Sequence, residues 1–140
     1  MNAKVYYFSR SGNTKKLADA IAAALDTQAR DVKEQPLEEK ADAVFLGASM
    51  YAGTVDPAVR AFLEANADNI GLLAVFGSSA SGRSTYAKIR EIADANRIAL
   101  AEDSFMCLGH FLFLHKDRPG QADCAAAGDF AKNVLEKLDQ

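Results

Sequence analysis

Apolar residues along this chain follow two patterns that alternate with each other. Short runs of mostly apolar residues predict strands, and apolar residues that recur every three or four positions predict amphipathic helices. The predicted strands are Val5–Phe8, Gln28–Lys33, Ala43–Gly47, Gly71–Phe76 and Ala99–Leu108. The predicted helices are Lys15–Leu25, a short helix that begins at Pro57, a helix with Tyr86, Ile89, Ile92 and Ala93 on its inner face, and Ala122–Leu138. Strands therefore alternate with helices along the whole chain.

Two of the predicted strands, Ala43–Gly47 and Gly71–Phe76, are apolar throughout. Such runs are typical of parallel strands in a sheet that helices cover on both faces. The alternation of strands and helices then indicates an α/β protein with a doubly wound parallel sheet. Five strands fit the smaller architecture of this kind, with strand order 2-1-3-4-5, better than the six-stranded dinucleotide-binding fold. The charged segment Leu37–Asp42 is predicted to be a connector with one helical turn.

The composition is that of an ordinary globular protein, with 49% apolar and 25% charged residues in a chain of 140. We therefore expect residues 1–140 to form one domain. A formal net charge of −3 argues against a nucleic-acid partner, which usually requires a basic face. No apolar run approaches the ~18 residues of a membrane span, and the first residues lack a signal-peptide core. Two cysteines are too few for a disulfide framework, so a cytoplasmic location is expected.

Three polar loops follow predicted strands, and all three lie at carboxyl ends. They are residues 9–14, 48–54 and 77–84. Ligands of doubly wound sheets bind beyond the carboxyl ends of the strands, at the switch in strand order. We therefore expect the three loops to form one site. The first loop also precedes a helix N-terminus, where unpaired N–H groups and the helix dipole favour a phosphate group.

The first loop differs from several other phosphate-binding motifs. It contains no Gly-x-x-x-x-Gly-Lys-Ser/Thr, and because Gly12 is its only glycine it is not a Gly-x-Gly-x-x-Gly loop. The strand ends at Ser9 and Ala48 also lack the acidic cluster of a receiver domain. Simple capping of the helix by Ser, Asn and Thr side chains is the alternative to phosphate binding.

The loop Ser9-Arg10-Ser11-Gly12-Asn13-Thr14 resembles the phosphate loop of the flavodoxin family, Ser/Thr-x-Ser/Thr-Gly-Asn-Thr. The segment 47–54 is similar to the second flavin loop of that family, often Gly-Ser-Pro-x-Tyr-x-Gly-Thr. Cys107-x-Gly109 and Arg118-Pro119 resemble the end of short bacterial flavodoxin-like proteins. The resemblance covers essentially the whole chain, and it implies a flavodoxin-like fold.

The resemblance also implies that the chain binds FMN. The first loop would bind the phosphate, through Ser9, Arg10, Ser11, Gly12, Asn13 and Thr14. The second would flank one side of the isoalloxazine ring, with Tyr51 stacked on it, through Ser49, Met50, Tyr51, Ala52 and Gly53. The third would hold the other edge of the ring through its backbone, at Ser78, Ser79, Ala80, Ser81 and Gly82. The alternatives are a surface aromatic at Tyr51 and a flexible turn in the third loop.

Two features depart from the family pattern. Many flavodoxins hold the ring between two aromatic side chains, whereas the third loop offers none before Tyr86, which we predict to lie in the core. One face of the ring would then be more open. The loops also carry Arg10 and Arg83 with only Asp56 nearby in sequence, so we expect the reduced flavin anion to be less destabilised than in acid-lined relatives. Gly53 would allow the preceding peptide to turn over toward N5 of the ring.

Two further groups of residues are weaker candidates. Cys107, His110, His115 and Cys124 offer four zinc ligands, but their spacing matches no common zinc finger. Buried thiols and loop histidines are the preferred interpretation. The segment Phe111–Leu114 is unusually apolar for a loop, and we expect it to cover the core or to form a contact with a partner or a second copy.

The sequence leaves three functions open. The preferred one is an FMN-binding electron carrier that passes single electrons from a reductase to an acceptor protein. The second is an FMN-dependent NAD(P)H:quinone oxidoreductase or similar small flavin reductase, with a substrate pocket over the open flavin face and built at a homodimer interface. The third is a flavodoxin-fold module that binds partners without FMN.

Overall fold

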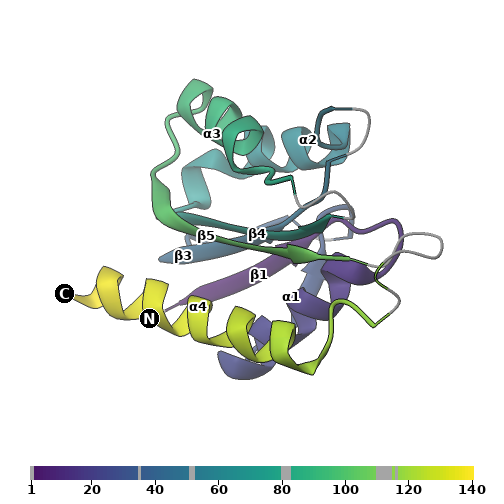
Figure 1. Cartoon of the computed structure of the whole chain (residues 1–140). Helices are drawn as coiled ribbons and strands as arrows, with labels where there is room; N and C mark the ends of the chain where they lie inside the picture. Colours follow the sequence, from purple (N-terminus) through teal and green to yellow (C-terminus); the bar gives the residue numbers. More distant parts are fainter. Residues whose placement is uncertain (1, 35, 51–52, 80–82, 110–114, 116) are drawn as a thin grey trace.

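The first strand lies inside the sheet, between the second and the third. A computed structural model describes residues 2–34, 36–50, 53–79, 83–109, 115 and 117–140. Its five parallel strands are ordered β2-β1-β3-β4-β5 (Figure 1). The strands are β1 (Ala3–Tyr7), β2 (Ala29–Asp31), β3 (Ala43–Gly47), β4 (Leu73–Ser79) and β5 (Leu100–Leu108). The helices are α1 (Asn13–Ala24), α2 (Pro57–Asn66), α3 (Tyr86–Ala95) and α4 (Gln121–Asp139), with a 3-10 turn at Ala67–Asn69. The predicted fold and strand order are confirmed.

The sheet is the middle of three layers (Figure 1). Successive residues of β1 point to opposite faces, as the period of a strand requires. Val5 and Tyr7 belong to a core cluster with α1 and α4, whereas Tyr6 and Phe8 belong to a second cluster with α2 and α3. Every residue of β3 is buried, because helices cover both of its faces. The two cores explain why the central strands are apolar throughout.

The helices form where the apolar spacing predicted them. In α1 the inner positions Leu17, Ala18, Ile21 and Ala22 are all buried. At the start of α2, Pro57 occupies the first turn and the Asp56 carboxylate accepts a hydrogen bond from the Ala58 N–H at 2.9 Å. None of the helices in the described part of the chain combines the length and the apolar character that crossing a membrane requires.

Two predictions about local structure were wrong. β4 extends to Ser79, so Gly77, Ser78 and Ser79 are strand residues and not loop residues, because their backbone continues the pairing with Met106, Cys107 and Leu108 of β5. The connector 37–42 contains no helical turn in its described conformation. Its first residue, Leu37, is held instead by two side-chain amides, one from the last residue of α2 and one from the 3-10 turn: its N–H donates to Asn66 at 2.9 Å and its carbonyl accepts from Asn69 at 3.2 Å.

The carboxyl end of β4 lies directly against the segment that follows β3. A Cβ atom added to Gly77 would lie 2.1 Å from the Ala48 carbonyl oxygen, which is far inside van der Waals contact. One added to Gly47 would lie 2.5 Å from the Phe76 ring and 2.8 Å from the Thr14 methyl group. Gly47 and Gly77, at the ends of neighbouring strands, therefore allow the segments that follow β1, β3 and β4 to approach one another.

We expect Gly77→Ala to lower the free energy of unfolding by about 3 kcal/mol, because the new methyl group would overlap a backbone atom that cannot rotate away. Gly12→Ala is the matched control. Gly12 has open space around its missing side chain but a φ of 88°, so only left-handed backbone strain of about 1–2 kcal/mol is expected there. Urea unfolding of both variants measures the difference, and equal losses would contradict the close approach.

Candidate functional site

Three side chains meet at the carboxyl edge of the sheet: Thr14 from the first turn of α1, Ser49 from the loop after β3, and Ser78 from the end of β4. The Thr14 hydroxyl oxygen lies 2.9 Å from that of Ser49 and 3.0 Å from that of Ser78. The Ser49 hydroxyl donates to the Ser78 carbonyl oxygen at 2.7 Å. These residues follow β1, follow β3 and end β4, which are neighbours in the sheet. The three loops that the sequence predicted to form one site are therefore brought together.

The directions of these hydrogen bonds follow from the number of protons, since each hydroxyl has only one. Ser49 gives its proton to the Ser78 carbonyl, so in the bond between Thr14 and Ser49 the donor is Thr14. The proton of Thr14 is then committed, so Ser78 donates to Thr14. We call these three residues the hydroxyl circuit. Its protons are all used within the protein, and Thr14 and Ser78 are only 1% and 3% exposed.

The turn before α1 keeps other hydroxyl protons for a ligand. The Ser9 oxygen accepts from the Gly12 N–H at 3.0 Å, and the Ser11 oxygen accepts from the Asn13 N–H at 3.5 Å. In both bonds the hydroxyl is the acceptor, and no bond within the described part of the chain uses its own proton. Gly12 is the N-cap of α1 with a φ of 88°, a conformation that glycine adopts readily. Gly12 itself has no side chain to cap the helix, but the Ser11 hydroxyl accepts from the first N–H of α1, so the capping that the sequence offered as an alternative is made in part.

A salt bridge ties the first loop to the second. The Arg10 guanidinium lies 2.9 Å from the Asp56 carboxylate, whose other oxygen caps α2. The Ala58 N–H, and then the Arg10 guanidinium, hold the pKa of Asp56 below its ordinary value. Sequence analysis placed Arg10 and Asp56 in separate loops and did not predict this contact. Much of the charge of Arg10 is therefore offset by a partner.

The end of β5 also reaches the site, which sequence analysis missed. Gly109 follows β5 and is buried, and a Cβ atom added to it would lie 3.0 Å from the Asn13 amide and 3.2 Å from the Ser78 side chain. One sequence feature could have indicated this contact. A glycine, Gly47, Gly77 or Gly109, stands at or near the end of each of the strands β3, β4 and β5. Four strand ends therefore contribute to this edge of the sheet.

The part of the second and third loops nearest the predicted flavin ring is described incompletely. Tyr51, Ala52, Ala80, Ser81 and Gly82 lie outside the described residues, as do His110 and the apolar segment 111–114. Met50 is half-buried against the core on the α2 and α3 side. Gly53 has a φ of 81° and open space in place of a side chain, as a peptide that turns over requires.

Tyr86 and Thr85 stand where the third loop enters α3. Tyr86 packs against the core, as predicted, and its hydroxyl donates to the Ala101 carbonyl oxygen at 2.8 Å. Thr85 is completely buried, and its hydroxyl oxygen has no hydrogen-bond partner among the described residues. A buried hydroxyl without a partner destabilises the fold. Thr85 and Thr14 are therefore two buried threonines in opposite situations.

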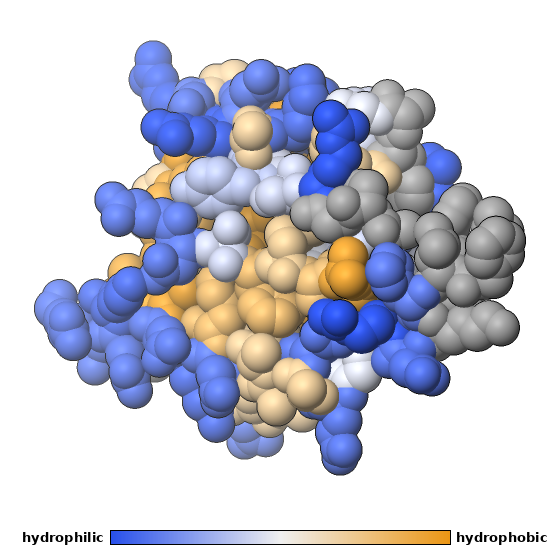
Figure 2. Space-filling model, in the orientation of Figure 1, coloured by the Kyte–Doolittle hydropathy of each residue, from blue (hydrophilic) through white to orange (hydrophobic). Residues whose placement is uncertain are grey.

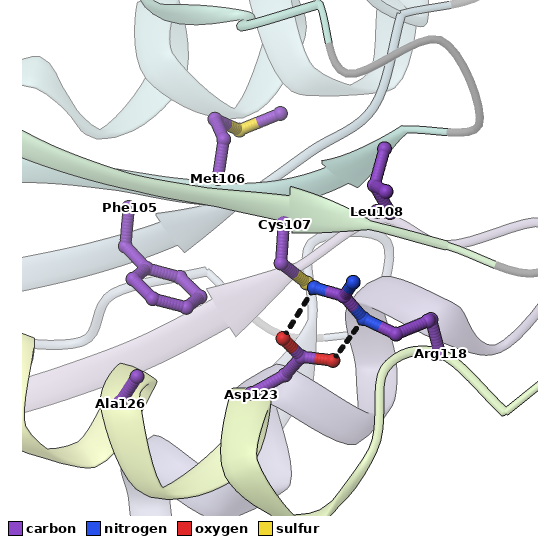
Figure 3. Close-up of a pocket in the computed structure, with 7 residues that line it drawn as sticks. All are labelled: Phe105, Met106, Cys107, Leu108, Arg118, Asp123 and Ala126. Carbon is purple, nitrogen blue, oxygen red and sulfur yellow. Dashed lines mark hydrogen bonds and ion pairs between the residues drawn. The ribbon is translucent and has the colours of Figure 1, made fainter. Parts of the chain in front are cut away.

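A shallow hollow of about 300 Å³ lies beside the last residues of β5 (Figure 3). Phe105–Leu108 line it together with Arg118, Asp123 and Ala126. Figure 2 shows apolar residues in the middle of this face of the molecule, with hydrophilic residues around them. Arg118 forms two hydrogen bonds of 2.7 Å to the Asp123 carboxylate, which hold the pKa of Asp123 below its ordinary value. Asp123 also accepts from the Gly120 N–H, which fixes the start of α4.

Cys107 is the thiol of this hollow, and burial raises its pKa to about 11. Burial also raises the pKa of the Cys124 thiol. The sequence prediction of buried thiols is correct to the extent that both are half-buried. Among the described residues, no three Cys, His, Asp or Glu side chains come together as metal ligands would.

The hydroxyl circuit and the unpaired hydroxyl of Thr85 predict opposite effects of the same substitution. We expect Thr14→Val to lower the free energy of unfolding by about 1–3 kcal/mol, because the buried Ser78 hydroxyl loses its acceptor and Ser49 keeps only its bond to the Ser78 carbonyl. Thr85→Val is expected to be neutral or to stabilise by up to about 1 kcal/mol. Urea unfolding of the two variants measures both changes. An equal loss of unfolding free energy in Thr14→Val and Thr85→Val would show that the bonds of the hydroxyl circuit do not stabilise the fold.

The raised pKa of Cys107 predicts slow alkylation. At pH 8 only about one in 1,000 of these thiols is ionised, against about one in four for an ordinary cysteine. We expect iodoacetamide to label Cys107 at least about 100-fold more slowly than a free cysteine peptide, with Cys124→Ser used to isolate the site. Labelling at the rate of the peptide would contradict the burial of this thiol.

Comparison with known proteins supports one family. A family model described as a flavodoxin domain matches residues 4–98. In structure, the chain is similar to a flavodoxin from the domain Archaea, with a TM-score of 0.80 and 22% identity over 100% of both chains. It is also similar to oxidised flavodoxin 2 from Bacillus cereus, with a TM-score of 0.69 and 20% identity over 98% of this chain and 99% of that one.

A third similar structure is a flavoprotein in complex with FMN from Lactobacillus acidophilus, with a TM-score of 0.62 and 15% identity over 76% of this chain and 92% of that one. No curated protein matches the chain in sequence. At these identities the structural likeness shows the fold alone, whereas the family model matches more than half of the chain. The chain therefore belongs to the flavodoxin family.

Proposed function

We propose that this protein binds FMN and carries single electrons between redox proteins. The observation that carries the proposal is the turn 9–14, where a helix N-terminus, Gly12 in the left-handed region and two hydroxyls with uncommitted protons occur together. A dianionic phosphate is the ligand that such a group of donors suits. The flavodoxin family and the FMN complex of a structural neighbour support the choice of FMN.

The donors in this turn fit the phosphate of FMN. The hydroxyls of Ser9 and Ser11 and the first N–H groups of α1 would bind it, with Arg10, Gly12 and Asn13 in the same turn. Thr14 would take part through its backbone N–H, since its hydroxyl proton is committed to Ser49. Binding by N–H groups and neutral hydroxyls leaves the phosphate a dianion, because none of these groups needs to lose or gain a proton.

The ring of FMN would lie between the second and third loops. Our proposal assigns one side to Ser49, Met50, Tyr51, Ala52 and Gly53, and the other edge to Ser78, Ser79, Ala80, Ser81 and Gly82. Ser49 and Ser78 would act mainly by holding the loops together, because both hydroxyls belong to the circuit. The bound flavin supplies the redox chemistry, and the protein supplies binding and electrostatics.

One observation favours a second candidate, a small FMN-dependent NAD(P)H oxidoreductase. The ring of Tyr86 packs in the core and its hydroxyl is bonded to Ala101, so this tyrosine does not serve as a second stacking partner. The third loop, residues 77–84, contains no aromatic residue. One flavin face would then be open to a nicotinamide or a quinone. We propose the carrier first because the chain belongs to the flavodoxin family.

The proposed partners are a reductase and an acceptor protein in the cytoplasm. One domain of residues 1–140 would carry the whole site, since all four strand ends that meet there belong to the same sheet. A homodimer would be needed only if the second candidate function is correct.

The visible spectrum of the purified protein after incubation with FMN and removal of free flavin tests the proposal. We expect flavin absorption bands that stay with the protein, and no bleaching when NADPH is added without a reductase. A colourless protein would contradict FMN binding and favour a partner-binding module. Rapid bleaching by NADPH alone would favour the oxidoreductase.

We expect Ser11→Ala to weaken FMN binding about tenfold, because it removes one hydrogen bond to a charged group. Ser104→Ala is the matched control, since Ser104 is an exposed serine of β5 outside the loops. Quenching of flavin fluorescence during titration of the apoprotein measures both affinities. Equal FMN affinity in the two variants would show that the Ser11 hydroxyl does not bind the phosphate.

A further inference from the structure

A cavity of about 460 Å³ lies between the sheet and the connector that joins β2 to β3. None of its described lining residues belongs to the three loops of the candidate flavin site. The connector contains no helix in its described residues, 32–34 and 36–42. Parallel strands are usually joined by a crossover helix, whereas here irregular chain covers the edge strand β2 on this face. The missing helix leaves room for the cavity.

One wall of the cavity is made by three side chains from one face of the sheet. Lys4 and Tyr6 are two residues apart in β1, so both point to the same side. Arg30 of β2 is in register with Tyr6 and points to that side as well. All three line the cavity. The sheet therefore presents two cationic groups and a phenol hydroxyl to it.

Tyr6 is the buried member of this wall. It is 3% exposed, and its ring packs on that of Phe62 with 4.6 Å between the centroids. Its hydroxyl donates a long hydrogen bond of 3.4 Å to the Pro36 carbonyl oxygen. Burial raises the pKa of Tyr6, and Arg30 and Glu38 are close enough to lower and to raise that pKa respectively. The hydroxyl of Tyr6 therefore stands between groups of opposite charge.

The other wall is the connector, which is fixed on both sides of its acidic residues. The backbone of Leu37 is bonded to two side-chain amides from the end of α2 and the 3-10 turn. The side-chain amide of Asn2 donates to the Lys40 carbonyl oxygen at 3.1 Å. Glu38 and Glu39 lie between these two anchors, and both line the cavity. This wall is therefore preformed, which lowers the entropic penalty of binding a ligand.

The carboxylates of the connector do not neutralise Lys4. No ion pair joins Lys4 to Glu38 or to Glu39 in the described part of the chain. The Glu39 carboxylate accepts a long hydrogen bond of 3.4 Å from the Asn2 amide. A ligand with charge of one sign would be attracted by one wall and repelled by the other. A ligand that carries both charges finds a partner on each wall.

We propose that this cavity binds a small zwitterion of the amino-acid class. The carboxylate of the ligand would lie against Lys4, Arg30 and the hydroxyl of Tyr6, and its ammonium group against Glu38 and Glu39. The volume of the cavity is within the range of small-molecule sites. The inference goes beyond the proposed function, since it assigns a second ligand to a second site.

Zwitterions of graded length test the proposal, because the separation of the two walls selects among them. We expect glycine, γ-aminobutyrate or ε-aminocaproate to shift the amide NMR signals of Tyr6, Arg30 and Leu37, with a Kd of about 5 mM or below for the best probe. Caproate and hexylamine carry one charge each and should bind at least about fivefold more weakly than ε-aminocaproate. Equal binding of either, or no shift with any zwitterion at about 50 mM, would overturn the proposal.

Variants that remove one charge locate the binding site. Lys4→Gln and Glu38→Gln should each weaken binding of the best probe by about three- to tenfold, the effect of one charge-assisted hydrogen bond. Lys40→Gln is the matched control, because Lys40 is an exposed residue of the same connector but is not among the described lining residues. It should alter the affinity by less than about 1.5-fold. Equal losses in Lys4→Gln and Lys40→Gln would indicate attraction by net charge alone and would overturn the proposal.

The same titration with FMN present separates this inference from the proposed function. We expect the best probe to bind with unchanged affinity, because the described lining residues lie outside the three loops. Loss of probe binding when FMN is added would place the probe in the flavin site and overturn the proposal. Failure of FMN to bind would contradict the proposed function alone and leave the probe titrations to judge the cavity.

Discussion

The site depends on how closely three strand ends approach one another. Gly77 lets the Ala48 carbonyl lie against the end of β4, and the space behind Gly47 is filled by Phe76 and Thr14. The three hydroxyls of Thr14, Ser49 and Ser78 then bond one another in a single direction and end on a backbone carbonyl. Loops fixed in this way need little rearrangement to receive a ligand, which lowers the entropic penalty of binding.

The hydroxyl residues of the turn 9–14 therefore have two different structural roles. In the turn 9–14, Ser9 and Ser11 keep their hydroxyl protons, whereas Thr14 uses its proton to hold the second loop. A motif shows which residue types are present but not which way each hydroxyl points. The same holds for Asp56, which caps α2 and also binds Arg10. Its two oxygens connect the start of α2 to the turn 9–14.

Much of the fold could be predicted from the sequence because its strongest signals are local or follow from general topology. Runs such as Ala43–Gly47 give buried strands, and the spacing of Leu17, Ile21 and Val134 gives helix faces that pack on the sheet. The end of β4 could not be predicted, because Ser78 and Ser79 look like loop residues until their pairing with β5 is known. The contacts of Arg10 with Asp56 and of Gly109 with Asn13 are non-local and leave no periodic pattern.

The central claim is that a preformed turn at the start of α1 anchors the phosphate of FMN. Isothermal titration calorimetry of the apoprotein with FMN and with riboflavin tests it most directly, since the two ligands share the ring and differ in the phosphate. We predict that riboflavin binds at least about 100-fold more weakly, the effect of losing two charge-assisted hydrogen bonds. Equal affinity for the two ligands, or no binding of FMN, would contradict the account.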